Sequence, residues 1–326
     1  MPEAEAINAS PAPKAPTGRT MDGASWTLLV LLSVLWGSSF VFVEIILTAL
    51  PVVTLVALRV LIAALTLWLV VGVLRVPVPG STAIWASFVV LGLFNNAIPF
   101  SLIVWGQTEI TAGLAAILNA TTPLFTALIA GAALADERLT ATKLLGIGLG
   151  IAGVAVMIGP QTILTLGDDL FHQLAVLGAA LSYGIAAVFG RRFGRAGIKP
   201  IVVAAGQTSA SACIMVPLAL LIDGAAFLGT DSALVWLAVV ANACLSTGLA
   251  YILYFTVLGR AGATNVALVT VLVPVVAVLM GALLLSEAIG VMQLVGMALI
   301  FAGLAVMDGR LLDRLRPRPG KRFHRS

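Results

Sequence analysis

The chain has 326 residues, of which 60% are hydrophobic and only 10% charged, with a mean hydropathy of +1.12 and a net charge of +4. A soluble protein carries about 25% charged residues, so this composition excludes a globular surface covered by water. Apolar runs of about 20 residues, each long enough to cross a bilayer, follow one another along the chain. We therefore predict an all-α polytopic membrane protein.

Ten membrane-spanning helices are predicted, because a backbone in hydrocarbon must satisfy its own hydrogen bonds. A disordered cytosolic tail, residues 1–25, would precede them, and a basic cytosolic tail, residues 310–326, would follow. The spans divide into two five-helix halves, residues 26–160 and 171–309. The predicted spans are Trp26–Leu47, Pro51–Val73, Thr82–Trp105, Ala112–Ala133, Ala141–Ile158, Phe171–Phe189, Ile201–Ile222, Leu234–Leu258, Ala263–Leu285 and Val291–Val306.

The basic residues predict how these spans are oriented. With both termini in the cytoplasm, all Lys and Arg residues except Arg59 fall on the cytoplasmic side, and Arg59 lies within the second span. Loops on the other side carry only acids, such as Asp168 and Asp223. This distribution follows the positive-inside rule. The net positive charge therefore indicates orientation, not a nucleic-acid partner, and the basic tail is suited to contact anionic lipid.

One segment of the chain occurs twice, with substitutions. LLGIGLGIAGVAVMIG, residues 144–159, returns as LVGMALIFAGLAVMDG at residues 294–309, with 9 of 16 positions identical. Each half holds five predicted helices, an odd number, so the second half would cross the membrane upside down relative to the first. That inverted repeat is the plan of many secondary transporters, which bind substrate between the halves. Other matches, at offsets of 149 to 151, pair Ala112-Gly113 with Ala261-Gly262, Pro123 with Pro274, and Glu137 with Glu287.

Glycines recur within the repeated segment. Gly148-x-Gly150-x-x-Gly153 resembles a dinucleotide-binding pattern, but it lies in an apolar span and follows no strand, so that interpretation fails. Small residues at helical spacing favour close packing of helices. The two spans could pack on each other or on a second protomer, so a monomer and a homodimer both fit. The predicted packing glycines are Gly146, Gly150, Gly153, Gly296 and Gly303.

Polar and aromatic residues gather near the middle of six or seven spans. Any single Ser, Thr or Asn could simply bond a neighbouring helix, for about 0.6 kcal/mol. A whole polar layer favours a wet central cavity, because polar groups facing lipid are costly. The layer has no fixed charge, which suits a net-neutral zwitterion with an apolar or aromatic side chain. The candidate substrate-binding residues are Trp36, Ser39, Asn95, Asn96, Asn119, Tyr183, Gln207, Ser246 and Tyr251.

Two prolines lie near the middle of the fourth and ninth spans, Pro123 and Pro274. Each removes a backbone hydrogen bond and favours a kink. Because the prolines are related by the repeat, their kinks would lie symmetrically beside the cavity. We predict that both spans bend there as access to the cavity alternates.

Two charges lie within predicted spans: Glu44 near the outer end of the first, and Arg59 in the second. Arg59 is about 12 Å from the outer end, at about 1.5 Å per residue. A charge within the membrane indicates a functional role by default. An ion pair between Glu44 and Arg59 across adjacent spans is nevertheless the favoured interpretation, because Arg side chains snorkel outward.

A set of short motifs covers essentially residues 26–309. It comprises Trp36-Gly37-Ser38-Ser39-Phe40, Leu58-Arg59, Asn95–Phe100, Trp105-Gly106-Gln107, and the run from Ala112-Gly113 through Pro123 and Asp136-Glu137-Arg138 to Gly146–Gly153. These motifs resemble the EamA type of the drug/metabolite transporter superfamily. The resemblance implies ten helices in two inverted halves, in a bacterial inner membrane, and export of small metabolites. An exporter of the YddG type, carrying aromatic and other neutral amino acids, fits best.

No cofactor or metal site is indicated, and no carboxylate lies at mid-membrane, which favours facilitated diffusion over proton antiport. The alternatives are proton-coupled efflux of amphipathic drugs or cations, and transport of sugars or nucleosides. An integral membrane enzyme is a remote alternative. Its catalytic cluster is missing, because His172 and His324 are isolated and Glu137 and Glu287 have no partner motif.

Overall fold

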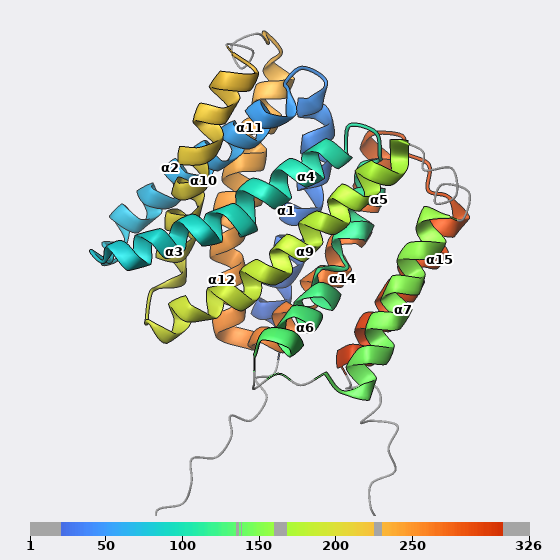
Figure 1. The fold of residues 1–326 in the computed structure, drawn as a ribbon. Helices are drawn as coiled ribbons and strands as arrows, with labels where there is room; N and C mark the ends of the chain where they lie inside the picture. Colours follow the sequence, from blue (N-terminus) through green and yellow to red (C-terminus); the bar gives the residue numbers. More distant parts are fainter. Residues whose placement is uncertain (1–20, 135–136, 138, 160–167, 225–229, 309–326) are drawn as a thin grey trace, which may run out of the picture.

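The computed structural model describes residues 21–134, 137, 139–159, 168–224 and 230–308. In this part of the chain every regular element is a helix (Figure 1). The elements are α1 (Gly23–Leu47), α2 (Val52–Val73), α3 (Thr82–Gly92), η1 (Leu93–Ala97), α4 (Ile98–Gly106), α5 (Ala112–Asn119), α6 (Thr122–Ala133), α7 (Ala141–Ile158), α9 (Asp168–Arg195), α10 (Pro200–Ile222), α11 (Ala233–Ala243), η3 (Cys244–Leu249), α12 (Ala250–Ala261), α13 (Ala263–Val266), α14 (Val269–Leu284) and α15 (Val291–Asp308).

Among the described residues, nine helical stretches are long and apolar enough to cross a membrane. The predicted span Ala263–Leu285 is not one continuous helix: α13 ends at Val266, and α14 is a separate apolar helix of 16 residues. At the other end of the chain α1 begins at Gly23, before the predicted Trp26. Asp22 explains the early start, because its carboxylate accepts a hydrogen bond from the Ser25 backbone N–H at 2.8 Å and caps the helix. The two predicted tails lie almost entirely outside the described residues.

The outer surface of the bundle is strongly apolar. Leu69, Leu221 and Leu283 are 68%, 83% and 81% exposed, and many other large apolar side chains share this surface. In water such a surface would drive aggregation, whereas in hydrocarbon it has no hydrophobic cost. The buried interior holds Ser, Thr, Asn and Gln as well as apolar side chains. This distribution of polarity is the one expected of a membrane protein.

The repeated segments pack on each other within one chain. α7 and α15 form a close pair at one side of the bundle (Figure 1). A Cβ at Gly146 would lie 2.5 Å from the carbonyl oxygen of Gly303, and one at Gly153 would lie 2.7 Å from that of Gly296. The reverse contacts are as close, since a Cβ at Gly303 would meet the backbone of both Gly146 and Gly150. The predicted packing glycines therefore face one another, which lets the two backbones touch.

Four interruptions break the helices at related places in the two halves. The π segments η1 and η3 lie at the same offset within α3–α4 and α11–α12. A further break separates α5 from α6 at Ala120–Thr121, and another separates α13 from α14 at Ala267–Leu268. Pro123 follows the break at Ala120–Thr121 and lies in the first turn of α6, where a missing N–H costs nothing. Pro274 lies inside α14, six residues or more beyond its break, so the two prolines do not mark equivalent bends.

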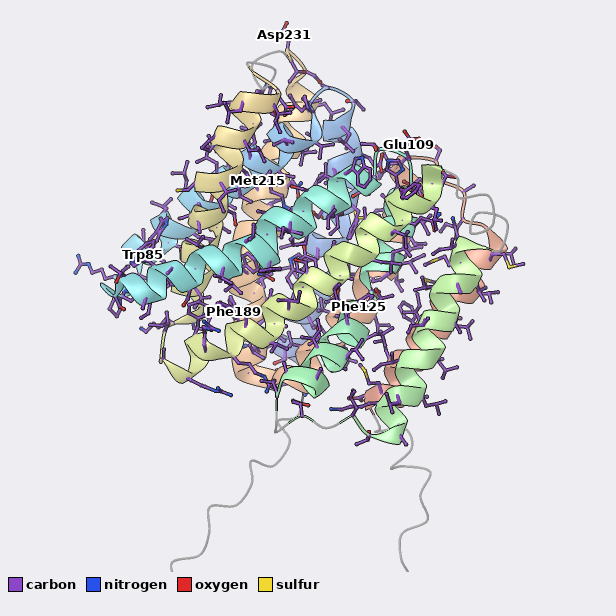
Figure 2. The ribbon with its side chains drawn as sticks, viewed as in Figure 1. Trp85, Glu109, Phe125, Phe189, Met215 and Asp231 are labelled. Carbon is purple, nitrogen blue, oxygen red and sulfur yellow. The ribbon has the colours of Figure 1, made fainter. Side chains whose placement is uncertain are left out.

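Each end of the bundle is named after a glutamate that lies there. The end where α1, α4 and α14 finish and α5 begins is called the Glu287 end. The opposite end, where α1 starts and α6 finishes, is called the Glu137 end (Figure 1). Figure 2 labels Glu109 at the Glu287 end, and Phe125 and Phe189 toward the Glu137 end.

Candidate functional site

Four of the candidate residues form one hydrogen-bonded network in the middle of the bundle. The Asn95 amide donates to Gln207 Oε1 at 3.0 Å and to the Tyr251 hydroxyl at 3.3 Å. Tyr251 in turn donates to Asn96 Oδ1 at 2.9 Å. Asn96 also donates to the hydroxyl of Ser211, which was not among the predicted residues. The π segment η1 makes this possible, because its wider turn holds both adjacent asparagines against neighbouring helices.

The second π segment supports another polar cluster. In η3, Thr247 accepts a hydrogen bond from the Nε of Arg59 at 3.0 Å. One turn earlier, Asn242 accepts a bond from Ser39 Oγ of α1 at 2.9 Å. The Arg59 guanidinium also stacks over Phe100, 3.9 Å from the ring centroid. Thr247 and Asn242 were not predicted as site residues, although Thr247 stands next to the predicted Ser246.

The structure contradicts the predicted ion pair between Glu44 and Arg59. Glu44 accepts a hydrogen bond from the Gln107 amide at 3.0 Å instead. The reason is packing: α2 lies mainly against α10 and α11, which turns Arg59 toward η3 and away from α1. The prediction that the polar layer carries no fixed charge is also wrong, since Arg59 joins that layer through Thr247.

The remaining candidates are more scattered. Trp36 stacks against Tyr254, with ring centroids 5.5 Å apart, and makes no hydrogen bond to the network of described residues. Asn119 lies at the break between α5 and α6, and its buried Oδ1 has no hydrogen-bond partner among the described residues. Ser246 Oγ is likewise buried without a partner there. Tyr183 packs between two groups of buried apolar side chains, one around Leu118 and the other around Phe100.

Glu287 caps the start of a distant helix, a contact that sequence reasoning missed. Its carboxylate accepts the backbone N–H groups of Ala112 at 2.8 Å and Gly113 at 3.1 Å. The positive end of the α5 dipole favours a carboxylate at this position. Gly281 leaves room for that carboxylate, because a Cβ on Gly281 would collide with it. The repeated Ala-Gly and Glu motifs were visible in the sequence, but their contact was not.

Glu137, the repeat equivalent of Glu287, is bound differently. It accepts hydrogen bonds from Lys143 Nζ at 3.0 Å and from Arg191 Nη2 at 2.7 Å. These two cations hold the pKa of the Glu137 carboxyl below its usual range. At Gly131, the equivalent of Gly281, the neighbouring space is filled by the Leu139 side chain and not by a carboxylate.

A recess of about 600 Å³ opens at the Glu287 end. Gln107 lies in its floor and donates to the Phe40 carbonyl at 2.9 Å as well as to Glu44, which ties α4 to α1. The lining comes from α1, α11 and the connections after α1, α4 and α14, and its acidic and hydroxyl residues are Glu44, Thr48, Thr108, Glu109, Thr111, Ser232 and Glu287.

The sequence profile of the EamA-like transporter family matches the chain twice, over residues 24–159 and 170–307. The chain is a member of the EamA-like transporter family. This membership, with the apolar helices, makes it a multi-pass membrane transporter, and each match covers one of the two predicted halves.

Individual relatives agree with this membership. A "Probable amino-acid metabolite efflux pump" of Escherichia coli is 31% identical over 298 residues, covering 86% of this chain and 93% of the relative. The "Uncharacterized transporter YoaV" of Bacillus subtilis is 25% identical over 277 residues, covering 85% and 94%. A crystal structure with a TM-score of 0.63 and 22% identity covers 89% of this chain and 99% of that protein, and therefore shows the same fold.

Proposed function

We propose that this EamA-like transporter exports neutral amino acids, aromatic ones included, across a bacterial inner membrane by alternating access, as exporters of the YddG type do. Relatives named as amino-acid metabolite efflux pumps support this substrate class. The two matches to one family profile support two halves related by duplication. In this proposal the halves are inverted, α13 and α14 together form the ninth span, and substrate binds between the halves at the polar layer.

The orientation follows from the charges at each end. Arg191, Arg192 and Arg195 lie together at the Glu137 end, where Arg191 and Lys143 both bond Glu137. Asp223, Asp231 and Glu109 belong to the Glu287 end. The positive-inside rule then assigns the Glu137 end to the cytoplasm. Both termini would be cytoplasmic, and the recess would be the outer vestibule.

One observation carries the proposal of alternating access: two repeat-related carboxylates are in different states. Glu287 accepts hydrogen bonds from the first two backbone amides of α5 and so connects the α14–α15 loop to the other half. Glu137 caps no helix in the described part of the chain and bonds Lys143 and Arg191 instead. A symmetric scaffold with no moving parts gives no reason for this difference, whereas a transporter closed on one side has both arrangements at once.

Helices of the two halves pack on each other on both sides of the α5–α6 break. α5 packs on α14, on α1 and on α9, so the Glu287 end is closed beneath the recess. α6, on the other side of the break, packs on α9 and less extensively on α7, while α13 packs on α12. The α6–α9 contact joins one half to the other just as the α5–α14 and α5–α9 contacts do. The proposal that this state is open toward the cytoplasm therefore rests on the Glu287 cap and not on helix packing.

The cycle would exchange these states. As the cytoplasmic side closes, Glu137 would leave Lys143 and Arg191 and cap the start of α13, near Gly262, as Glu287 now caps α5. Glu287 would then release α5, and the outer side would open. The breaks beside Pro123 and before α14 would let the two halves of each broken span move separately.

The test is counterflow of radiolabelled Phe, Leu and Met into proteoliposomes at the same pH on both sides. We expect exchange that protein-free liposomes lack and that Asn95→Ala strongly reduces. Ser87→Ala is the matched control, because Ser87 is a half-buried residue of the same span whose hydroxyl bonds only the Ala83 carbonyl of its own helix. Movement only under a pH gradient would overturn facilitated diffusion and favour proton coupling through Glu44. Movement of drugs, sugars or nucleosides without amino acids would overturn the substrate class.

A further inference from the structure

Arg59 is a buried cation without a counter-ion. It lies on α2 with 8% of its surface exposed, in the middle of an apolar bundle. Both ion pairs in the described part of the chain involve Glu137, so no described carboxylate neutralises Arg59. A charge in such a place is costly unless a partner compensates it.

Two acids that lie on or directly after helices in contact with α2 are bonded elsewhere. Glu44 of α1 is bonded to Gln107. Asp223, at the end of α10, accepts both the backbone N–H of Thr54 at 2.9 Å and its hydroxyl at 2.7 Å, and so caps α2 itself. Neither carboxylate can turn to Arg59 without breaking these bonds. The compensating anion is therefore not supplied by a described side chain.

Most of the hydrogen-bonding capacity of Arg59 is unused. A guanidinium has five N–H donors, and only the Nε–H has an acceptor, Thr247. The four Nη hydrogens have no acceptor among the described residues. Tyr183 packs against the apolar cluster that contains Phe100, and its hydroxyl makes no hydrogen bond among the described residues either. Unused donors around one buried cation call for a ligand rich in acceptors.

Further unpaired groups lie on η3 and the turn before it. Ser246, next to Thr247, has a buried hydroxyl with no partner in the described chain. The side-chain nitrogen of Asn242 is buried and unpartnered in the same way, while its side-chain oxygen accepts from Ser39 and its backbone carbonyl from Thr247. Buried polar groups are rarely left unpaired. Around η3, therefore, these two groups and Arg59 lack partners that a small ligand or water would supply.

We infer that Arg59 binds the carboxylate of the transported substrate, with Tyr183, Asn242 and Ser246 beside it. The two Nη groups form a fork that matches the two oxygens of a carboxylate. The Phe100 ring covers one face of the guanidinium and keeps the fork in place. This inference rests on the proposed function and narrows it, because a buried cation attracts amino acids and repels cationic drugs.

The first experiment uses the unmodified full-length protein in proteoliposomes and compares three competitors of labelled Phe counterflow. They are unlabelled Phe, phenylalaninamide, which lacks the carboxylate, and 3-phenylpropionate, which lacks the amine. We expect phenylalaninamide to compete about 10- to 100-fold more weakly than Phe, the range for losing charge-assisted hydrogen bonds. We expect 3-phenylpropionate to compete measurably. Equal competition by Phe and its amide overturns the inference and leaves amino-acid export standing.

Variants then locate the effect at Arg59. Arg59→Lys keeps the charge but loses the fork, so we expect it to bind Phe about 10-fold more weakly. Arg59→Met should remove the preference for Phe over its amide. Arg75→Met is the control, since Arg75 is exposed beyond the end of α2. An unchanged preference in Arg59→Met overturns the inference; if that variant does not fold, the comparison of competitors on the unmodified protein decides.

A binding measurement separates this inference from the proposed function. If no amino acid moves, thermal stabilisation of the purified protein by 3-phenylpropionate, lost in Arg59→Lys, still supports a carboxylate site while export of amino acids fails. Stabilisation by chloride alone, equal to that by 3-phenylpropionate, shows a site for any small anion and overturns the carboxylate assignment. No stabilisation by either anion overturns it as well.

Discussion

Ala112 donates its backbone N–H to the Glu287 carboxylate at 2.8 Å, although 175 positions separate them in the chain. Together with the bond from Gly113, this contact joins the two repeats at one end of the bundle. A carboxylate at a helix start is stabilised by two charge-assisted hydrogen bonds and by the helix dipole. Because the equivalent Glu137 makes no such contact, the Glu287 cap distinguishes the two ends of the molecule.

Removing this cap should open the Glu287 end. Glu287→Ala loses both bonds, which at a partly exposed position contribute on the order of 1–2 kcal/mol and shift an open–closed equilibrium about 10-fold. A cysteine replacing the buried Ala115 on α5, in a chain without Cys213 and Cys244, reports the opening through its rate of labelling by a membrane-impermeant maleimide. Glu109→Ala is the control, since Glu109 is exposed at the same end. Equal labelling in both variants would contradict the role given to Glu287.

The Glu137 cluster should respond to acid. The Lys143 and Arg191 hydrogen bonds lower the pKa of Glu137 from its ordinary value near 4.5. A lowered pKa means that the stabilisation is complete above about pH 4.5 and is lost as the pH falls through the lower, folded-state pKa. Thermal melts of the purified protein between pH 7 and pH 3 should therefore show an acid-dependent loss that Glu137→Gln lacks. Parallel pH curves for the two proteins would show that the cluster contributes nothing.

The α7–α15 contact should tolerate no added methyl group at its centre. Gly146→Ala would place a Cβ 2.5 Å from the Gly303 carbonyl oxygen, and we expect a loss of about 1–3 kcal/mol in unfolding free energy. Gly148→Ala is the matched control on the same helix, because nothing lies within 4 Å of its Cβ. That control should be neutral or gain up to about 1 kcal/mol from helix propensity. Similar melting temperatures for the two variants would mean that this contact is loose in the membrane protein.

The prolines should affect transport rate more than folding. Pro274→Ala restores an N–H inside α14, and Pro123→Ala restores one beside the α5–α6 break. The N–H at position 274 can bond within α14, whereas the one at position 123 gains a partner only where α5 and α6 join into one helix across the break. One backbone hydrogen bond contributes about 1 kcal/mol, so we expect roughly fivefold slower counterflow from each variant. Because Pro274 lies away from its break, the effect of Pro123→Ala should be the larger. Unchanged transport rates in both variants would remove the hypothesis that these spans bend during the cycle.

Much of the fold followed from local properties of the sequence. An apolar run of about 20 residues must be helical in hydrocarbon whatever surrounds it, so nine of the predicted spans match the described helices closely. The ninth span was predicted as one helix because its hydropathy is continuous, yet the chain turns at Ala267–Leu268. The π segments were not predicted either, because one extra residue in a helical turn leaves no local mark in the sequence.

The depth of the polar layer was readable from the sequence, since position along an apolar span sets position along the helix. The partners of its residues were not, because many helices surround each side chain and only packing selects the one it meets. Packing places Arg59 in hydrogen-bonding distance of Thr247, 188 positions away, and Glu44 in hydrogen-bonding distance of Gln107. In the same way the sequence alone predicted Glu137 and Glu287 as equivalent positions, and only the tertiary structure decided which of them caps a helix.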